Sequence, residues 1–487
     1  MPVITLDGSP TEHTIAPNYT LTAPRLIGRV APAAHPRSLQ RSGDSAPPLP
    51  GLDQALTLTQ TAVEQSILLD IERVIGPAPS GSTRSAAQTR TLRTPMFSAN
   101  VGQAVLYTDE ASGISQWIFP VHVDSTPARR GGARVVYYLP DDSPPEPEAP
   151  GTQRGAIIKG IRKVVRVISW YTDELLGHTI ESFVAGWEAR RRAYGWQMVP
   201  LNNREDVDWS YVRGGRCLLL LHGTMSTAEA AFGALPSATV EALRSIYAGR
   251  VIAFSHPTLA SDPAANVDTL LDTLPPDLAL DIVAHSRGGL VARDLLRRIS
   301  TPTPLQVGKL IMVATPNRGT RLVDGDHWLE MLDRYTSLLA DLPDTTATVM
   351  LEGVLTLIKI IGHSGLRQLA GLAAMTPNST FLQHLNSEAA ADPRLFALAA
   401  EYQPTDSLWV KRFLKQQGDG LIDTFFEEAN DGVVPTSGGY QADDQAAGWH
   451  IPAAQRVIFP SSERIHHSGF FGNAVVGRQL VDWLKRA

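Results

Sequence analysis

The chain has 487 residues, of which 43% are apolar and 19% are charged, and its formal net charge at pH 7 is −6. This composition is that of an ordinary globular protein, and the length allows about two or three domains. The mildly negative charge argues against nucleic acid as a partner. The single cysteine, Cys217, excludes a disulfide framework and is expected to be a buried small hydrophobe in a strand.

The sequence gives no sign of a targeting signal or of a membrane-spanning segment. The first residues lack a basic stretch followed by an apolar one, so no signal peptide is expected. The longest apolar stretch, residues 349–361, is interrupted by Glu352 and Lys359 and is too short to span a bilayer. The cytoplasm is therefore the expected compartment, and export by a route that needs no N-terminal signal stays open.

The first part of the chain is predicted to be an accessory region. Residues 1–50 are rich in Pro, Ser, Thr and Ala, and we expect them to be extended or partly disordered. Residues 51–140 are predicted to form a small α+β unit. It begins with a helix over 52–75, where apolar residues recur at helical spacing before Gly76-Pro77. Short strands are expected at 101–107, 116–123 and 133–138.

A linker and a connector are expected to follow. Residues 141–153 are rich in Pro and acidic residues, which is typical of a linker. Residues 154–208 are predicted to be a helical connector. Over 154–167 the apolar residues fall on one side of a helical wheel, and Lys and Arg fall on the other. Such a helix could lie on an anionic membrane surface, but the acidic Asp173 and Glu174 soon after it favour an ordinary docked helix.

From about Trp209, strands and helices alternate, which is typical of a parallel sheet with helical crossovers. Residues 209–487 are therefore predicted to form an α/β domain around a mainly parallel sheet of the eight-stranded type. Strands are expected at 216–221, 251–254, 280–284, 309–314, 395–400 and 456–459. Helices between them are expected to include 228–235, 239–247, 267–274 and 289–299. An insertion at about 320–377, rich in aliphatic residues at helical spacing, is predicted to be a helical lid.

The most informative segment is residues 281–291, Asp-Ile-Val-Ala-His-Ser-Arg-Gly-Gly-Leu-Val. An apolar strand ends at Ser286, which lies between the small residues Ala284 and Gly288 and is followed at once by a helix. This is the pattern of a nucleophile elbow, a turn so tight that the serine hydroxyl stands clear of the backbone. A serine there needs a base to take its proton and amide donors to hold the oxyanion.

Candidates for both exist elsewhere in the chain. His222-Gly223-Thr224 closes a predicted strand about sixty residues before the serine. Acids that follow the serine are Asp419, Asp423, Asp431 and Asp443. Two adjacent histidines, His466 and His467, follow the last predicted strand, and only one of them can point at Ser286.

Residues from about 216 to 487 resemble the lipase-like branch of the α/β-hydrolase superfamily, in which serine, acid and histidine occur in this order. A closer resemblance is to a group of bacterial members that share three blocks. These blocks are Ala-Phe-Ser-His-Pro-Thr-Leu at 253–259 with Asp262-Pro263 and Asn266, His-Ser-Arg-Gly-Gly-Leu-Val-Ala-Arg at 285–293, and Ala-Thr-Pro-Asn at 314–317 with Gly319-Thr320. One departure is Ala284, where the general elbow motif has glycine.

The resemblance implies an α/β-hydrolase fold and a role for each candidate. Ser286 would be the nucleophile, and the N–H groups of Thr224, with Met225 as a further option, and Arg287 would form the oxyanion hole. Asp431 is favoured as the acid, because its Asp-Gly-Val-Val-Pro context matches many lipases. His467 is favoured as the base, because small polar residues and an aromatic pair follow it, and His466 is the reserve base.

Two further residues, His256 and Arg287, could have either a functional or a structural role. His256 is expected to bond the backbone at the turn before Pro257 rather than to act as a ligand. The Arg287 side chain could bind a substrate phosphate or carboxylate, or equally form a salt bridge. The sequence contains no metal-binding motif and no Gly-rich phosphate loop, so neither a metal nor a cofactor is expected.

Together these observations predict a serine hydrolase that cleaves carboxylic esters of lipids or other hydrophobic acyl compounds through an acyl-enzyme. The aliphatic lid would bind an acyl chain or merely form its own core. The same three residues could also serve an amidase, a thioesterase or an acyltransferase. A non-catalytic interaction module on a hydrolase scaffold is a further alternative, and residues 1–200 are the expected site of any protein or membrane-surface partner.

Overall fold

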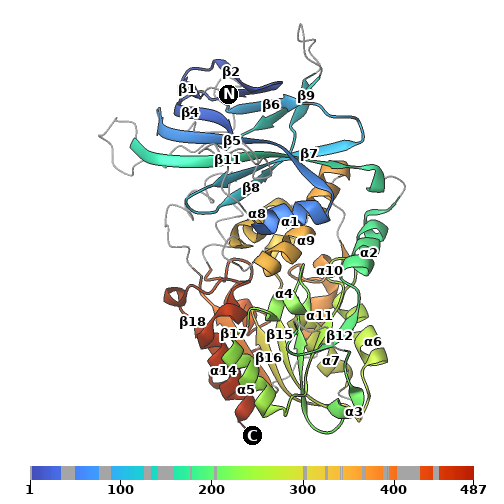
Figure 1. Cartoon of the computed structure of the whole chain (residues 1–487). Coiled ribbons are helices and arrows are strands. Elements are labelled where there is room, and N and C mark those ends of the chain that lie inside the picture. Colours follow the sequence, from blue (N-terminus) through green and yellow to red (C-terminus); the bar gives the residue numbers. More distant parts are fainter. Residues whose placement is uncertain are drawn as a thin grey trace.

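The computed structural model consists of a β-rich part, a layer of helices and an α/β part, stacked along one axis (Figure 1). The structure describes residues 3–33, 50–75, 89–124, 133–140, 157–175, 178–201, 206–299, 304–323, 327–339, 342, 344–364, 369–387, 392, 394–402, 428–442 and 449–486. The predicted linker at 141–153 lies outside these residues.

The α/β part is built on a mainly parallel sheet in the strand order β12-β14-β13-β15-β16-β17-β18. Its strands are β12 (Gly195–Met198), β13 (Cys217–Leu221), β14 (Val251–Ser255), β15 (Ala279–His285), β16 (Gln306–Val313), β17 (Leu395–Ala400) and β18 (Arg456–Phe459). All neighbours pair in parallel except the edge strand β12, which pairs antiparallel with β14. The sheet has seven strands among the described residues, one fewer than the eight-stranded type that the sequence predicts. The predicted strands are confirmed with small shifts at their ends.

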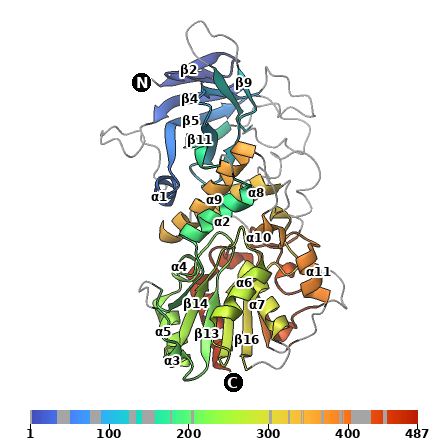
Figure 2. The ribbon, with the colours of Figure 1, turned by 90° about the vertical axis from the view of Figure 1, so that its right-hand side faces the viewer.

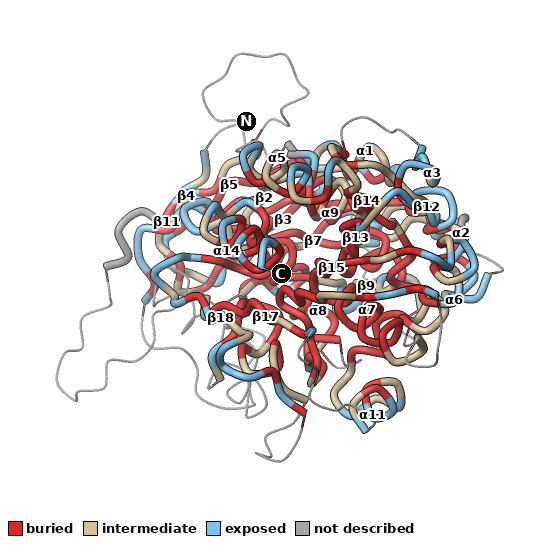
Figure 3. The backbone as a smooth tube through the Cα atoms, turned by 90° about the horizontal axis from the view of Figure 1, so that it is seen from below, coloured by how far each residue is buried: buried red, intermediate tan, exposed pale blue. Residues whose placement is uncertain are grey.

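Helices cover both faces of this sheet (Figure 2). They are α3 (Trp209–Val212), α4 (Ala228–Phe232), α5 (Ser237–Ile246), α6 (Pro263–Thr273), α7 (Arg287–Arg298) and α14 (Ala474–Lys485). Side chains alternate along β13: Leu218 and Leu220 belong to the core under α5 and α14, whereas Leu219 and Leu221 belong to the core under α6 and α7. Cys217 is buried in this strand, as predicted. Seen from below, the central strands are buried and the outer faces of α5 and α3 reach solvent (Figure 3).

The β-rich part is a sandwich of two antiparallel sheets, in the orders β1-β4-β5-β11-β7-β8 and β2-β3-β6-β10-β9. The strands are β1 (Ile4–Asp7), β2 (Glu12–Ala16), β3 (Tyr19–Thr22), β4 (Leu26–Ala33), β5 (Thr61–Val74), β6 (Thr91–Pro95), β7 (Val101–Asp109), β8 (Ser115–Ile118), β9 (His122–Asp124), β10 (Arg134–Tyr138) and β11 (Ile157–Tyr171). Leu, Ile, Val and Tyr side chains from both sheets form one core between them.

Three expectations for this half of the chain are wrong. Residues 4–33 form four strands instead of an extended or partly disordered segment. The predicted helix over 52–75 is a short helix, α1 (Pro50–Leu58), followed by the long strand β5. Among the described residues of the connector predicted at 154–208, only α2 (Ile180–Arg191) is a long helix, and residues 157–167 of the predicted amphipathic helix belong to β11.

The basic residues of β11 do not share one face, because Arg162 and Lys163 are neighbours in a strand and point to opposite sides of the sheet. The strand is central in its sheet, paired with both β5 and β7. Lys163 is buried and its Nζ lies 2.7 Å from Asp109 Oδ2. The β-branched residues of this segment favour a strand, and because both faces of the strand are covered, its apolar residues do not alternate as a half-exposed strand would.

The insertion between β16 and β17 places its first two helices between the sandwich and the α/β part (Figure 1). Its helices are α8 (Trp328–Leu338), α9 (Asp344–Ser364), α10 (Ala370–Ala373) and α11 (Thr380–Ser387). Among the helices that the structure describes, α9 alone is long and apolar enough to cross a membrane, by length and composition. However, 78% of its apolar window, Thr345–Gly362, is buried in the protein, which is typical of a core helix.

The sandwich docks on α8 through polar contacts. The Trp117 backbone N–H donates to Asp333 Oδ1 at 2.7 Å, and its indole N–H donates to Thr336 Oγ1 at 3.0 Å. The Ser115 N–H donates to Ser337 Oγ at 2.9 Å. The side chains of Trp117 and Asp333 are both buried, so directional hydrogen bonds inside an apolar core fix the contact between the sandwich and α8.

Asp333 makes this joint sensitive to pH. Burial raises the pKa of its carboxyl well above the usual value of 3.8. The folded protein therefore holds the proton more tightly than the unfolded chain does, and this stabilisation is present below pH 3.8 and is lost as pH rises through the folded pKa. We expect Asp333→Asn, whose amide oxygen can still accept from Trp117, to reduce the loss of unfolding free energy between about pH 4 and pH 7. Denaturant unfolding of both proteins at pH 4 and at pH 7 measures this difference in free energy.

The surface variant Asp277→Asn is the matched control, because this carboxyl is more than half exposed. A pH profile for Asp333→Asn that is as steep as that of the wild type would show that Asp333 does not keep its proton in the folded protein.

Candidate active site

Ser286 occupies a strained turn between β15 and α7. Its backbone has φ 51° and ψ −127°, a conformation that residues with a side chain rarely adopt. The turn closes only because its neighbours are small. A Cβ at Gly288 would lie 2.5 Å from the Leu221 carbonyl oxygen, and one at Gly223 would lie 2.7 Å from the Ser286 Cβ. The predicted elbow is thus present in the structure.

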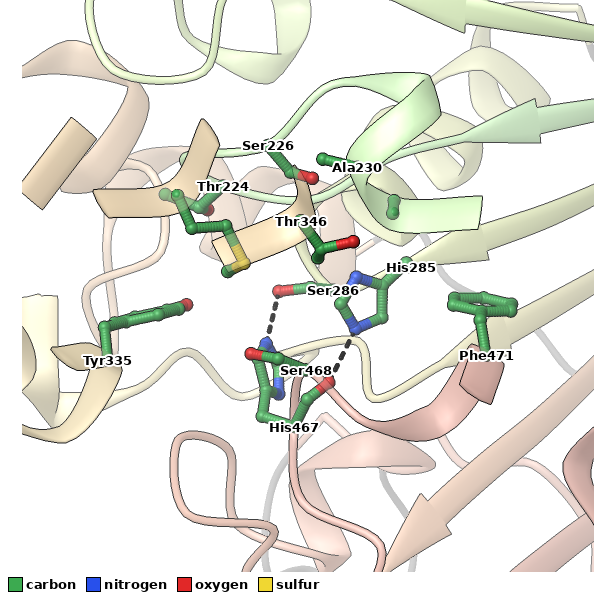
Figure 4. Close-up of a pocket in the computed structure, with 12 residues that line it drawn as sticks. Thr224, Ser226, Ala230, His285, Ser286, Tyr335, Thr346, His467, Ser468 and Phe471 are labelled. Carbon is green, nitrogen blue, oxygen red and sulfur yellow. Dashed lines mark hydrogen bonds between the residues drawn. The ribbon is translucent and has the colours of Figure 1, made fainter. Parts of the chain in front are cut away.

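The structure brings Ser286, His467 and Asp431 into one hydrogen-bonded chain. Ser286 Oγ lies 2.9 Å from His467 Nε2 (Figure 4), and His467 Nδ1 lies 2.8 Å from Asp431 Oδ2. All three residues are buried. Since a carboxylate only accepts, Nδ1 carries the proton and Nε2 is free to accept from the serine hydroxyl.

The second oxygen of Asp431 is held by the backbone of its own turn. Asp431 Oδ1 accepts from the N–H groups of Val433 at 3.0 Å and Val434 at 2.8 Å. The His467 N–H also donates to the Asp431 carbonyl oxygen at 2.9 Å. These bonds fix the carboxylate relative to the imidazole, so that its remaining oxygen faces Nδ1.

The reserve base, His466, does not contact Ser286. The ring of His466 packs against Tyr402, with 5.6 Å between centroids, and His467 is the residue that reaches the serine. The alternative acids Asp419, Asp423 and Asp443 lie outside the described residues.

His285 supports the histidine loop, a role that the sequence analysis did not assign. Its Nε2 lies 2.9 Å from the His467 carbonyl oxygen, and since that oxygen only accepts, Nε2 carries the hydrogen. Burial lowers the pKa of His285 to about 3, so the ring is neutral at pH 7. The only signal in the sequence is its place directly before the serine.

Two backbone N–H groups are available near the serine. Among the described residues, no hydrogen-bond acceptor is recorded for the N–H of Thr224 or for that of Arg287, the first residue of α7. The Met225 N–H, the further option in the sequence analysis, donates instead to Thr258 Oγ1 at 3.1 Å. The amides of Thr224 and Arg287 are therefore the two that could receive an oxyanion.

The Arg287 side chain is not open to a substrate phosphate or carboxylate, and it forms no salt bridge among the described residues. It is fully buried and donates to two backbone carbonyl oxygens, that of Gly371 at 3.2 Å and that of Ser261. Burial lowers the pKa of this guanidinium to about 10, which still leaves it protonated at pH 7. Arg287 therefore ties the elbow to α10 and to the loop after β14.

His256 has a structural position. It is buried and its ring stacks on that of His222, with 4.2 Å between centroids. The His256 N–H donates to His222 Nε2 at 3.0 Å, and His222 Nδ1 donates to the Gly223 carbonyl oxygen at 2.9 Å. Burial lowers the pKa of His222 to about 4, so this pair is neutral and holds the turn that carries Thr224.

Ser286 opens on a narrow void under α8 and α9. The void has two parts, and Tyr335 of α8 lines both. Met350 of α9 lines the first part. Within the described ranges, no group of three His, Cys, Asp or Glu side chains is placed to hold a metal ion.

Residues 188–485 match the family model described as a domain of unknown function (DUF7379). The search of curated proteins gave no match. Among solved structures, the chain is similar to lipase 1 from Pelosinus fermentans, with 15% identity and a TM-score of 0.37 over 56% of this chain and 99% of that one. It is also similar to phospholipase PlaB from Legionella pneumophila, with 16% identity and a TM-score of 0.36 over 56% of this chain and 60% of that one. A thermophilic esterase from Thermogutta terrifontis has 13% identity and a TM-score of 0.31, over 60% and 92% of the two chains.

The backbone conformation of Ser286 predicts that the elbow lowers the free energy of unfolding by a measurable amount. Glycine adopts positive φ freely, whereas alanine keeps the Cβ that makes this conformation unfavourable. We expect Ser286→Gly to be more stable than Ser286→Ala by about 1 kcal/mol, measured as the difference in free energy of unfolding. Both variants lack the hydroxyl, so the comparison isolates the backbone. An alanine variant that is as stable as the glycine variant would contradict the strain.

Proposed function

Because the chain belongs to the DUF7379 family, a domain of unknown function, we propose its activity from its own site: it is a serine hydrolase that cleaves carboxylic esters. The observation that carries this proposal is the hydrogen-bonded chain from Ser286 through His467 to Asp431, at an elbow that exposes the hydroxyl to a void. A buried serine, a neutral imidazole and a carboxylate in this arrangement make an alcohol nucleophilic.

The reaction follows from the atoms in contact. Ser286 Oγ attacks the ester carbonyl carbon while His467 Nε2 takes the hydroxyl proton, and Asp431 stabilises the imidazolium that forms. His467 then gives the proton to the oxygen of the departing alcohol. Water enters on the same side, loses a proton to His467 and releases the acid from Ser286.

The amides of Thr224 and Arg287 would hold the developing oxyanion. Both lie beside Ser286, one on the turn after β13 and one at the first position of α7, where the helix dipole also favours negative charge. One such donor contributes on the order of 10²–10³-fold in rate in other serine hydrolases. Gly223 and Gly288 matter here because they let these two turns approach the serine.

Helices α8 and α9 would act as the predicted lid. They contribute Tyr335, Thr346 and Met350 to the walls of the void over Ser286, so they exclude bulk water from the reacting atoms. The aliphatic and thioether side chains that face this void favour a hydrophobic acyl compound, of a lipid or of a smaller ester. We keep the cytoplasm as the proposed compartment and assign no cofactor a part in the reaction.

A fluorophosphonate probe, which bonds only to an activated serine, tests this proposal. We expect wild type to be labelled, Ser286→Ala to be unlabelled, and labelling of His467→Ala to be slowed by at least about 10³-fold, because the serine loses its base. The neighbouring His466→Ala is the matched control and should react at close to the wild-type rate. Gel fluorescence after timed labelling measures all four proteins.

Circular dichroism establishes that each variant is folded. Folded wild type that stays unlabelled, or Ser286→Ala that labels as fast as wild type, would falsify the proposal. Normal labelling of His467→Ala with loss in His466→Ala would move the base to His466.

A further inference from the structure

We propose that the void around Ser286 is divided into an acyl compartment and an alcohol compartment, and that the substrates are esters of a short acyl group with a polar, hydroxyl-bearing alcohol. This inference rests on the proposed ester hydrolysis and adds the class of substrate. It follows from which side chains line each part of the void.

The two parts of the void have different walls. The first is lined by His467 together with the polar Ser226, Thr346 and Ser468 and the apolar Ala230, Ala231, Met350 and Phe471. The second is lined mostly by apolar side chains, among them Leu322, Val323, Met331, Met375 and Val434. Among the described residues, only Thr224, Ser286 and Tyr335 line both parts.

Tyr335 stands at the boundary between the two parts. It is buried, and its ring lies edge-on to that of His467, with 6.3 Å between centroids. Its helix cannot shift easily, because the residues on either side of it are bonded: Arg334 Nη1 donates to the Gly432 carbonyl oxygen at 3.1 Å, and Thr336 accepts from Trp117. The boundary is therefore a fixed wall.

Proton transfer decides which part receives which half of the ester. His467 must deliver the serine proton to the oxygen of the leaving alcohol, so that oxygen has to lie on the side of His467. His467 lines only the first part of the void. The alcohol therefore leaves through the first part, the alcohol compartment, and the acyl group occupies the second, the acyl compartment.

The acyl compartment suits a short apolar chain. Its two threonine hydroxyls are already engaged: Thr320 Oγ1 donates to the Val433 carbonyl oxygen at 2.7 Å, and Thr224 Oγ1 lies 3.6 Å from Met375 Sδ. Of the other polar side chains in this part, Ser286 is the nucleophile and Tyr335 stands at the boundary, so the remaining walls that meet the acyl chain are apolar. The space open to the centre of a water-sized sphere is only about 10 Å³, so a long acyl chain would have to push these walls apart, and a short one disturbs them least.

The alcohol compartment offers hydroxyl groups instead. Ser468 Oγ is buried and has no hydrogen-bond partner among the described residues. Thr346 lies opposite on α9, and its hydroxyl is likewise not engaged in any hydrogen bond recorded for the described residues (Figure 4). A buried hydroxyl gains most from a ligand that can pair with it, so these two groups favour an alcohol with a further hydroxyl, such as a glycerol ester.

The catalytic steps give each compartment its own kinetic signature. In the first step the Ser286 Oγ–carbon bond forms, the carbon–oxygen bond of the ester breaks, and the alcohol leaves with the proton from His467. The acyl-enzyme that remains is the same for every alcohol. A change in the alcohol compartment should therefore alter preference among alcohols without altering preference among acyl chains, and a change in the acyl compartment should do the reverse.

A crossed panel of esters tests this. The full chain is assayed by pH-stat on glycerol and propyl esters of acetate, butyrate and octanoate, and kcat/KM is compared. We expect wild type to prefer butyrate to octanoate and glycerol to propyl esters. Met331→Ala enlarges the acyl compartment and should shift the octanoate-to-butyrate ratio by about tenfold towards octanoate, with the alcohol preference unchanged.

Met331→Leu, which keeps the side-chain volume, is its control, and Val323→Ala replaces it if Met331→Ala does not fold. Thr346→Val removes one hydroxyl at constant shape and should lower the glycerol-to-propyl ratio by about fivefold to tenfold, leaving the acyl preference unchanged. Thr356→Val, on the same helix but outside the void, is the matched control.

The inference is overturned if Met331→Ala changes the alcohol preference rather than the acyl preference, if Thr346→Val changes the acyl preference, or if wild type prefers propyl octanoate. Those outcomes leave ester hydrolysis intact, since the esters are still cleaved. Wild type that cleaves none of the esters, with no fluorophosphonate labelling, would overturn the proposed function itself.

Discussion

The backbone conformation of Ser286 is the constraint on which the rest of the site depends. A positive φ at the end of a parallel strand turns the chain sharply enough to start α7 at once and to leave the hydroxyl beyond the edge of the sheet. That turn needs Gly223 and Gly288 beside it, and it is held by the bond from the Ser286 N–H to the Val313 carbonyl oxygen at 2.8 Å. Because the carboxyl ends of parallel strands meet at the same edge, the segments after β17 and β18 can then deliver Asp431 and His467 to the hydroxyl.

Helix α8 connects the site around Ser286 with the N-terminal sandwich. On one side it accepts the polar contacts of β8 from the sandwich, and on the other Arg334 donates to Gly432, the residue after Asp431. The same helix presents Tyr335 to the void. The sandwich and the turn that carries Asp431 are therefore both held by α8, which gives the N-terminal half a structural part in shaping the site.

Sequence reasoning succeeded where the signal is local. The strands of the α/β part are short apolar runs between helices, and the elbow, the Asp431 turn and the two histidines each lie within a few residues. It failed over 154–167, because both faces of this central strand are covered, so its apolar and polar residues do not alternate. The basic residues of the segment, among them the buried Lys163, are spaced like the polar face of a helix. Nor could it find Tyr335 or His285, whose roles depend on how distant segments dock: α8 against the sandwich, and the histidine loop against the elbow.

If Ser286 is the nucleophile, it must carry the acyl group as a covalent intermediate, and intact-enzyme mass spectrometry after rapid acid quench detects that intermediate. Wild type mixed with an activated butyrate ester should gain the mass of one butyryl group within the first turnover, and peptide mapping should place that group on the peptide that contains Ser286. His467→Ala should accumulate it far more slowly, because the serine then keeps its proton. Turnover of the ester with no added mass at any time, or a butyryl group on another residue, would contradict the claim.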